Sequence, residues 1–150
     1  MKKFVLASMI ALASVTAMAN TILEDVKISY VVRQAFIQEF GAVKNVNWQK
    51  AGEDILRANF NLDGEKISAF FNYEGNHLAT TIQKELKDLP RKLEKAIVEQ
   101  FGKRQPQELF ELINEDDHAY FFVIEEDGKS QVYKAYSSGH INRFNLTIHK

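Results

Sequence analysis

The stretch FNLDGEKISAFFNYEGNHLATTI, Phe60 to Ile82, predicts three short antiparallel strands in succession. Apolar and polar residues alternate up to Asp63-Gly64, a dipeptide that fits a tight hairpin because glycine accepts positive φ and aspartate tolerates it. The alternation resumes from Ile67 to Tyr73, and Gly75 marks a second turn. This pattern is typical of an antiparallel meander with one face against a core.

A second stretch repeats this pattern near the C-terminus: FFVIEEDGKSQVYKAYSSGHINRFNLTI, Phe121 to Ile148. Its turn at Asp127-Gly128 lies 64 residues after Asp63-Gly64, and Gly139 lies 64 residues after Gly75. Side-chain identity between the two stretches is low. We therefore interpret them as a repeated topology and not as a recent duplication.

Each meander follows a predicted helix. From about Leu23 to Phe40 apolar residues recur at helical spacing, and Gly41 follows where glycine commonly ends a helix. The second helix is predicted in KDLPRKLEKAIVEQFG, Lys87 to Gly102, where proline suits the first turn and Asp88 lies close enough to cap it. The two closing glycines lie 61 residues apart, so a small insertion separates helix and meander in the second half.

These elements predict an α+β fold built from two tandem repeats, about residues 23–86 and about 88–150. Each repeat is a helix followed by an antiparallel meander, and we expect the two to form one sheet with both helices packed on one face. A single repeat leaves an apolar sheet face without enough cover. The other strands are expected at 43–50, 56–62, 78–86, 108–113, 119–126, 132–136 and up to residue 148.

The first 19 residues have the features of a signal peptide. Lys2 and Lys3 provide the charged segment, Phe4 to Val15 the apolar segment, and Ala17-Met18-Ala19 the small residues that signal peptidase requires. We expect cleavage between Ala19 and Asn20, which leaves a domain of residues 20–150 in the periplasm or outside the cell.

Composition limits both the source of stability and the class of partner. The chain has no cysteine, so its stability must come from an apolar core and backbone pairing, and 11 Phe, 5 Tyr and 1 Trp supply large side chains for that core. Its formal net charge is −1 with both signs interspersed. Neither nucleic acid nor an anionic membrane is indicated as a partner, and no membrane span is expected.

Several motifs lie in a fixed order along the chain: AFIQEFG, the V-x-W of Val46 and Trp48, LRANFNLDG, FFNYEG, LP and YKAYSSGHI. In this order and spacing, over nearly all of Ala35 to Ile148, they resemble the secreted PepSY-like family of beta-lactamase-inhibitor-like proteins. The resemblance implies an antiparallel sheet covered by helices on one side and open on the other, with no catalytic residues. In the inhibitor after which the family is named, the open face grips an enzyme and disulfides staple the fold, whereas this chain has no cysteine.

No catalytic or metal-binding constellation is predicted. Ser137-Ser138-Gly139-His140 combines hydroxyls with an imidazole, but neighbours in a turn seldom reach the geometry of a nucleophile and its base. The four histidines are dispersed, without the spacing of a metal site. We therefore expect no enzymatic activity, no metal and no cofactor.

The predicted surface of interest is the polar side of the first meander. The alternation of Ile67 to Tyr73 places Tyr73 inward and Phe70 outward. An aromatic residue among polar neighbours commonly anchors a protein contact. The candidate partner-binding residues are Phe70, Arg57, Asn59 and Asn72. The second meander is too apolar on both sides for its faces to be assigned.

Two functions remain open at this point. The first is a non-enzymatic binding module that recognises or inhibits an unknown periplasmic or extracellular protein through the open sheet face. The alternative is a carrier that holds a small apolar ligand between sheet and helices.

Overall fold

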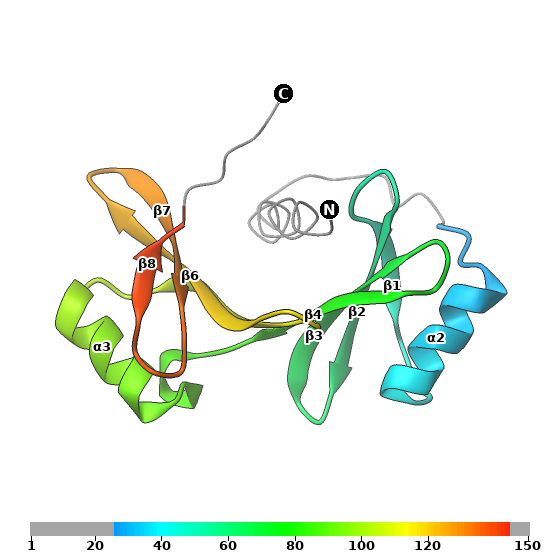
Figure 1. Cartoon of the computed structure of the whole chain (residues 1–150), viewed down its shortest axis with the longest axis horizontal. Coiled ribbons are helices and arrows are strands. Elements are labelled where there is room, and N and C mark those ends of the chain that lie inside the picture. Colours follow the sequence, from blue (N-terminus) through cyan, green and yellow to red (C-terminus); the bar gives the residue numbers. More distant parts are fainter. Residues whose placement is uncertain (1–25, 145–150) are drawn as a thin grey trace. The chain divides into compact units, whose positions relative to one another are not determined.

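The structure is a computed structural model that describes residues 26–144. Packing divides the chain into two compact units between Thr80 and Thr81, which we call unit 1 and unit 2 (Figure 1). The predicted signal peptide and its cleavage site lie outside the described residues, as do residues 145–148 of the last predicted strand. Among the described residues, no helix is long and apolar enough to cross a membrane.

Helices and strands follow the predicted order. Within residues 26–144 the strands form an eight-stranded sheet in sequential order, and the β1–β2, β2–β3, β5–β6, β6–β7 and β7–β8 pairs are antiparallel. The division between the units falls within β4. The elements are α2 (Tyr30–Phe40), β1 (Asn47–Lys50), β2 (Ile55–Leu62), β3 (Glu65–Asn72), β4 (His77–Gln83), the 3-10 turn η2 (Leu86–Asp88), α3 (Arg91–Phe101), β5 (Gln107–Ile113), β6 (His118–Glu126), β7 (Lys129–Ala135) and β8 (Ile141–Arg143).

The helix of unit 1 begins later than the sequence pattern indicates. Ser29 is its N-cap, and its side chain accepts a hydrogen bond from the backbone N–H of Val32 at 3.3 Å. That hydroxyl satisfies one of the backbone donors left unpaired at a helix start, so the helix begins at Tyr30. It ends at Gly41, whose φ of +78° suits glycine, as predicted.

The core of unit 1 lies between α2 and one face of β1 to β3. Phe36 of the helix contacts three aromatic rings of the strands at centroid distances of 5.5, 5.1 and 6.2 Å, namely Trp48, Phe60 and Phe71. Phe60 pairs with Ile67 across the β2–β3 hairpin, as the Asp63-Gly64 turn requires. The prediction that Tyr73 points inward is wrong, because β3 ends at Asn72 and the Tyr73 side chain is 42% exposed in the turn.

In unit 2 a separate 3-10 turn precedes α3, where the sequence pattern predicts only the helix. Asp88 belongs to η2, where its carboxylate accepts a hydrogen bond from the backbone N–H of Glu85 at 3.1 Å. The prediction that Asp88 caps the helix is therefore wrong. Pro90 is the N-cap residue of α3. Proline suits this place because it has no N–H to satisfy.

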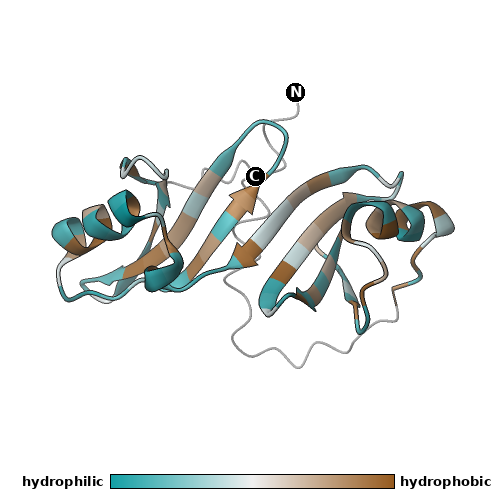
Figure 2. Ribbon diagram, turned by 90° about the horizontal axis from the view of Figure 1, so that it is seen from below, coloured by the Kyte–Doolittle hydropathy of each residue, from teal (hydrophilic) through white to brown (hydrophobic). Residues whose placement is uncertain are grey.

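The core of unit 2 lies between α3 and one face of β5 to β7. Phe101 packs edge-on against Phe122 and Tyr133, which stack on each other across the β6–β7 pair. Bands of hydrophobic and hydrophilic residues follow one another along the strands in Figure 2. The buried cluster consists of Leu89, Leu93, Ile97, Phe101, Leu109, Tyr120, Phe122, Ile124, Tyr133 and Ala135.

In each unit a glycine of the second turn lies against the helix. A Cβ on Gly75 would lie 2.8 Å from Val31 Cγ1 and 3.3 Å from the Val31 carbonyl oxygen. A Cβ on Gly139 would lie 3.2 Å from the Lys92 carbonyl oxygen. Both glycines have positive φ, +86° and +92°. A side chain at either place would strain the backbone and press on the first turn of the helix.

Candidate interaction surfaces

Successive side chains of a strand point to opposite faces, so the face of β1 to β3 away from α2 follows directly from the register. We call it the open face of unit 1. Its members include Gln49, Arg57, Asn59, Ser68, Phe70 and Asn72. All four candidate residues predicted from the sequence are therefore on the predicted face.

Arg57 lies at the centre of this face and is half-buried. It pairs with Gln49 on one side and with Phe70 on the other. Its Nη2 donates a hydrogen bond to the Gln49 Oε1 atom at 2.5 Å, whereas its Nε–H is buried without an acceptor. Burial of the guanidinium lowers the pKa of Arg57, because a charged group is disfavoured away from water. The charge of Arg57 is thus held in place by a neutral amide.

Phe70 differs from the expectation of an accessible aromatic ring. Its side chain is only 2% exposed. The reason is its place on β3, an inner strand, where side chains of both neighbouring strands border it. The ring can form the floor of a contact surface, but it does not protrude from it.

The two predicted asparagines have different surroundings. Asn59 lies beside Arg57 on the same face, and its Oδ1 accepts a hydrogen bond from the Ser68 hydroxyl at 2.7 Å. Asn72 lies at the end of β3, where its Oδ1 accepts hydrogen bonds from the backbone N–H groups of Glu74 and Asn76 at 3.1 and 2.8 Å. This asparagine shapes the β3–β4 turn.

The open face of unit 2 is defined in the same way, as the side of β5 to β8 away from α3. Its members include Phe110, Leu112, Phe121, Val132, Lys134 and Phe144. Phe121 stacks on Phe110 at 5.7 Å and meets Phe144 edge-on at 5.4 Å. The Phe121 side chain is 1% exposed, so these rings form a packed aromatic layer.

Lys134 lies directly opposite Phe121 on this face. Its Nζ lies 5.8 Å from the Phe121 ring centroid and 5.2 Å from that of Tyr136, and it forms an ion pair with Asp117. Burial alone would lower the pKa of Lys134, but its hydrogen bonds to Asp117 and Tyr136 and the charge of Asp117 outweigh it and raise the pKa. The positive charge of this face has its own counter-ion.

The sequence contains a signal that places this second cation on the open face. A two-residue turn at Asp127-Gly128 fixes the register of the hairpin and therefore pairs Phe121 with Lys134. No turn of this kind indicates which side chains of β5 lie on the open face. Glu108 has a φ of +49°, and the register of β5 shifts between Gln107 and Phe110, which reverses the alternation along that strand.

A cluster of polar side chains surrounds Glu111 on the helix side of unit 2. Its carboxylate contacts His118 Nε2 at 2.5 Å and Lys84 Nζ at 3.4 Å, and it accepts a hydrogen bond from the Tyr120 hydroxyl at 3.2 Å. Burial alone would raise the pKa of Glu111, but the hydrogen bonds and the charge of Lys84 outweigh it and lower the pKa. These contacts satisfy the carboxylate and are typical of a structural ion-pair network.

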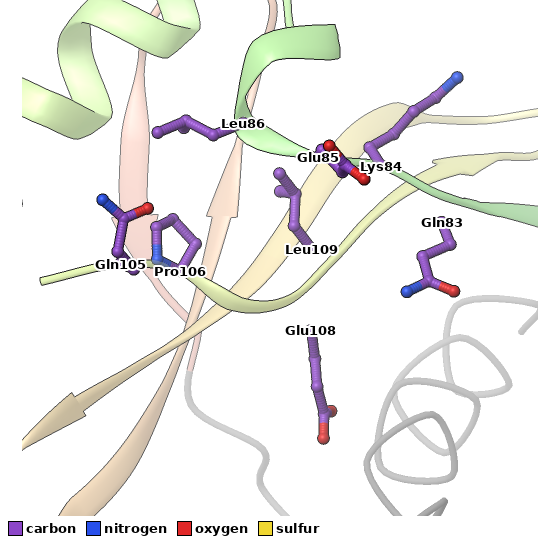
Figure 3. A pocket seen from close by; sticks show the side chains of 8 residues that line it. All are labelled: Gln83, Lys84, Glu85, Leu86, Gln105, Pro106, Glu108 and Leu109. Carbon is purple, nitrogen blue, oxygen red and sulfur yellow. The ribbon is translucent and has the colours of Figure 1, made fainter.

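A pocket of about 270 Å³ lies between the end of β4 and the start of β5. Figure 3 shows the lining side chains, with Lys84 and Glu108 extending in opposite directions. The pocket is lined by Gln83, Lys84, Glu85, Leu86, Gln105, Pro106, Glu108 and Leu109. A lining of this kind is mixed in polarity and unlike the apolar pockets that hold small hydrophobic ligands.

The Ser-Ser-Gly-His segment forms a hairpin turn. The backbone N–H of Gly139 bonds to the Tyr136 carbonyl at 2.9 Å, and the N–H of Tyr136 bonds to the His140 carbonyl at 3.0 Å. His77 lies against Phe40 and Phe71 in unit 1. Among residues 26–144, no three His, Asp or Glu side chains gather as a metal-binding group.

Comparison with solved structures shows a shared fold at low sequence identity. A DUF2874 family protein from Bacteroides ovatus has a TM-score of 0.70 and 14% identity, with 78% of this chain and 88% of that chain covered. A BLIP-like protein from Bacteroides fragilis has a TM-score of 0.71 and 17% identity over 83% of this chain and 91% of its own.

A third similar structure is a proposed periplasmic protein from Bacteroides eggerthii, with a TM-score of 0.71 and 12% identity over 81% of this chain and 91% of its own. No protein-family model matches the chain, and no curated protein sequence matches it. At fold level the chain is thus similar to DUF2874 and BLIP-like proteins.

Proposed function

We propose that the protein is a non-enzymatic binding module of the periplasm or cell exterior that recognises, and can inhibit, a protein partner through the open sheet faces of its units. One observation carries the proposal: the helix covers only one face of the strands in each unit, and the other face pairs a cation with a phenylalanine. These pairs are Arg57 with Phe70 and Lys134 with Phe121. Arginine and aromatic residues are enriched among the residues that dominate binding energy at protein interfaces.

The comparisons support the same reading. One similar structure is BLIP-like and another is a proposed periplasmic protein, which agrees with the signal-peptide pattern of residues 1–19. At sequence identities of 12–17% these structures support a shared fold but do not identify a binding partner. The partner is therefore best identified from the chemistry of the surface itself.

The proposal includes a tandem origin for the two units. Gly75 approaches the carbonyl of Val31, and Gly139 approaches the carbonyl of Lys92. Val31 and Lys92 are separated by the same 61 residues as the two helix-ending glycines. The same close contact between turn and helix at corresponding positions supports two copies of one helix-and-meander unit.

The proposed binding residues are Phe70, Arg57, Asn59 and Asn72. Arg57 and Asn59 supply donors and acceptors, Phe70 provides the apolar floor, and Asn72 holds the turn that ends β3. A carrier of small apolar ligands is the weaker reading. In both units the space between helix and strands is filled by aromatic contacts such as those of Phe36 and Phe101.

Site-specific photo-crosslinking in the periplasm of the source organism tests the proposal. A photoreactive phenylalanine analogue is placed at Asn59 on the open face and, as matched controls, at the exposed positions Gln38 of α2 and Lys95 of α3. We expect a discrete crosslinked protein from Asn59 and none from the controls. Crosslinks from the helix positions alone, or from none of the three, would overturn the proposal.

A further inference from the structure

The two open faces share a cross-strand pair but differ in how its charge is compensated. In unit 2 the ammonium group of Lys134 lies near the Phe121 ring and pairs with the carboxylate of Asp117. In unit 1 Arg57 lies opposite Phe70, and no carboxylate of residues 26–144 forms an ion pair with it. The open face of unit 2 therefore has a cation, an aromatic ring and an acid together, whereas that of unit 1 has only the cation and the aromatic ring.

The hydrogen-bond donors of Arg57 define what is missing. Nη2 carries two hydrogens and its one bond is to the neutral Gln49 amide, while the Nε–H is buried with no acceptor. The nearest polar groups on the same face, Asn59 and Ser68, bond to each other. A buried donor without a partner destabilises the free protein, and a negative group that bonds to the remaining Nη hydrogens on binding offsets that cost.

The acceptor that fits a guanidinium best is a carboxylate, because its two oxygens match the fork of N–H donors in geometry and charge. Burial also lowers the pKa of Arg57, so a negative partner would stabilise the charged form as Asp117 does for Lys134. The Phe70 floor lies beside this place and would exclude water from the pair.

We infer that the open face of unit 1 binds an acidic side chain, Asp or Glu, of the protein partner, and that its carboxylate pairs with Arg57. The inference rests on the proposed function and names the chemistry of the partner. Gln49 positions the guanidinium, and Phe70 supports the methylene groups of the acidic side chain.

A selection from random peptides displayed on phage tests this, with the purified full chain as bait and the display protein fused after each peptide, so that no free C-terminal carboxylate is present. Recovered sequences are synthesised with amidated C-termini, and their dissociation constants are measured for the original protein, Arg57→Gln and the matched control Arg33→Gln. Arg33 is exposed on α2, away from this face.

We expect the recovered peptides to share an Asp or Glu. Replacing that residue by its amide, or Arg57 by Gln, should weaken binding about ten- to a hundredfold, as for a hydrogen-bonded charged pair. The two changes combined should cost little more than either alone, because both remove the same contact. Arg33→Gln should leave binding unchanged, and Arg57→Lys should recover only part of it.

Three results would overturn the inference and separate it from the proposed function. If peptides bound Arg57→Gln as tightly as the original protein and bound Asn59→Ala or Phe70→Leu more weakly, that result would support binding through the open face and contradict recognition of an acidic side chain. Peptides whose binding depends on Arg57 but on no Asp or Glu would show that the guanidinium pairs with a neutral acceptor instead of an acid. Recovery of no peptide that is sensitive to open-face variants would contradict both.

Discussion

Replacing Arg57 by methionine should make the free protein more stable, although it removes a residue of the proposed binding surface. Methionine keeps the apolar stem of the side chain between Gln49 and Phe70 but has neither the charge nor the buried Nε–H. A buried donor without an acceptor destabilises by about 1–3 kcal/mol, and by more when it belongs to a charged group, while the bond of the charged guanidinium to Gln49 contributes about 1.5–3 kcal/mol in the opposite direction. Since the buried Nε–H belongs to the charged guanidinium, its cost is the larger of the two, and the difference is a gain of about 1 kcal/mol.

Urea unfolding followed by circular dichroism measures this change directly, with an expected rise in Tm of about 3–4 °C in a parallel thermal scan. Arg33→Met on the exposed side of α2 is the matched control and should change the free energy of unfolding by less than about 0.5 kcal/mol. A loss of 1 kcal/mol or more in Arg57→Met, with the control unchanged, would refute the reasoning, because it would mean that the guanidinium is fully satisfied in the free protein.

Three further changes test other parts of the structure. Gly75→Ala should destabilise by about 1 kcal/mol more than Gly64→Ala in urea unfolding, because both glycines have a φ of +86° but only the Cβ at Gly75 meets the first turn of α2. Ile97→Ala, in the α3 core, should lower the free energy of unfolding by about 2–5 kcal/mol, whereas its exposed neighbour Val98→Ala should change it by less than about 1 kcal/mol. Glu111→Gln should cost about 1–3 kcal/mol at pH 7. The pKa of Glu111 is lowered in the folded state, so the carboxylate stabilises the fold at pH values above the ordinary pKa of 4.5. This stabilisation is lost as the pH falls through the pKa of the folded state. The original protein and Glu111→Gln should therefore converge in stability below about pH 4.5. Parallel stability curves down to pH 2 would contradict the Glu111 network.

Much of the fold of unit 1 can be predicted because its signals are local. The Asp63-Gly64 turn fixes the register, and the alternation from Leu56 to Leu62 assigns the faces without ambiguity. Phe70 shows the limit of this reasoning. Alternation gives the face of a side chain, whereas its exposure depends on the strands on either side, and those are set by the whole sheet.

The faces of β5 and the ion pair of Lys134 in unit 2 could not be predicted from the sequence, for two physical reasons. The bulge at Glu108 reverses the alternation along β5, and a positive φ at a glutamate has no sequence signature. The ion pair of Lys134 with Asp117 joins a residue of β7 to one in the turn between β5 and β6, so only the assembled sheet reveals it. The register of the β6–β7 hairpin, however, was accessible from Asp127-Gly128.

The two Asp-Gly turns also determine which sequence changes keep the open faces intact. Each turn determines which residues of its hairpin lie opposite each other, and a register slip of one residue moves every side chain of a strand to the other face. An inserted or deleted residue in Asp63-Gly64 would shift β3 against β2, so that Arg57 would no longer lie opposite Phe70 although the composition of the strands stays the same. Substitutions on the open faces can therefore change the surface chemistry and keep the strand pairing, whereas a change in the length of either turn changes the pairing of its hairpin.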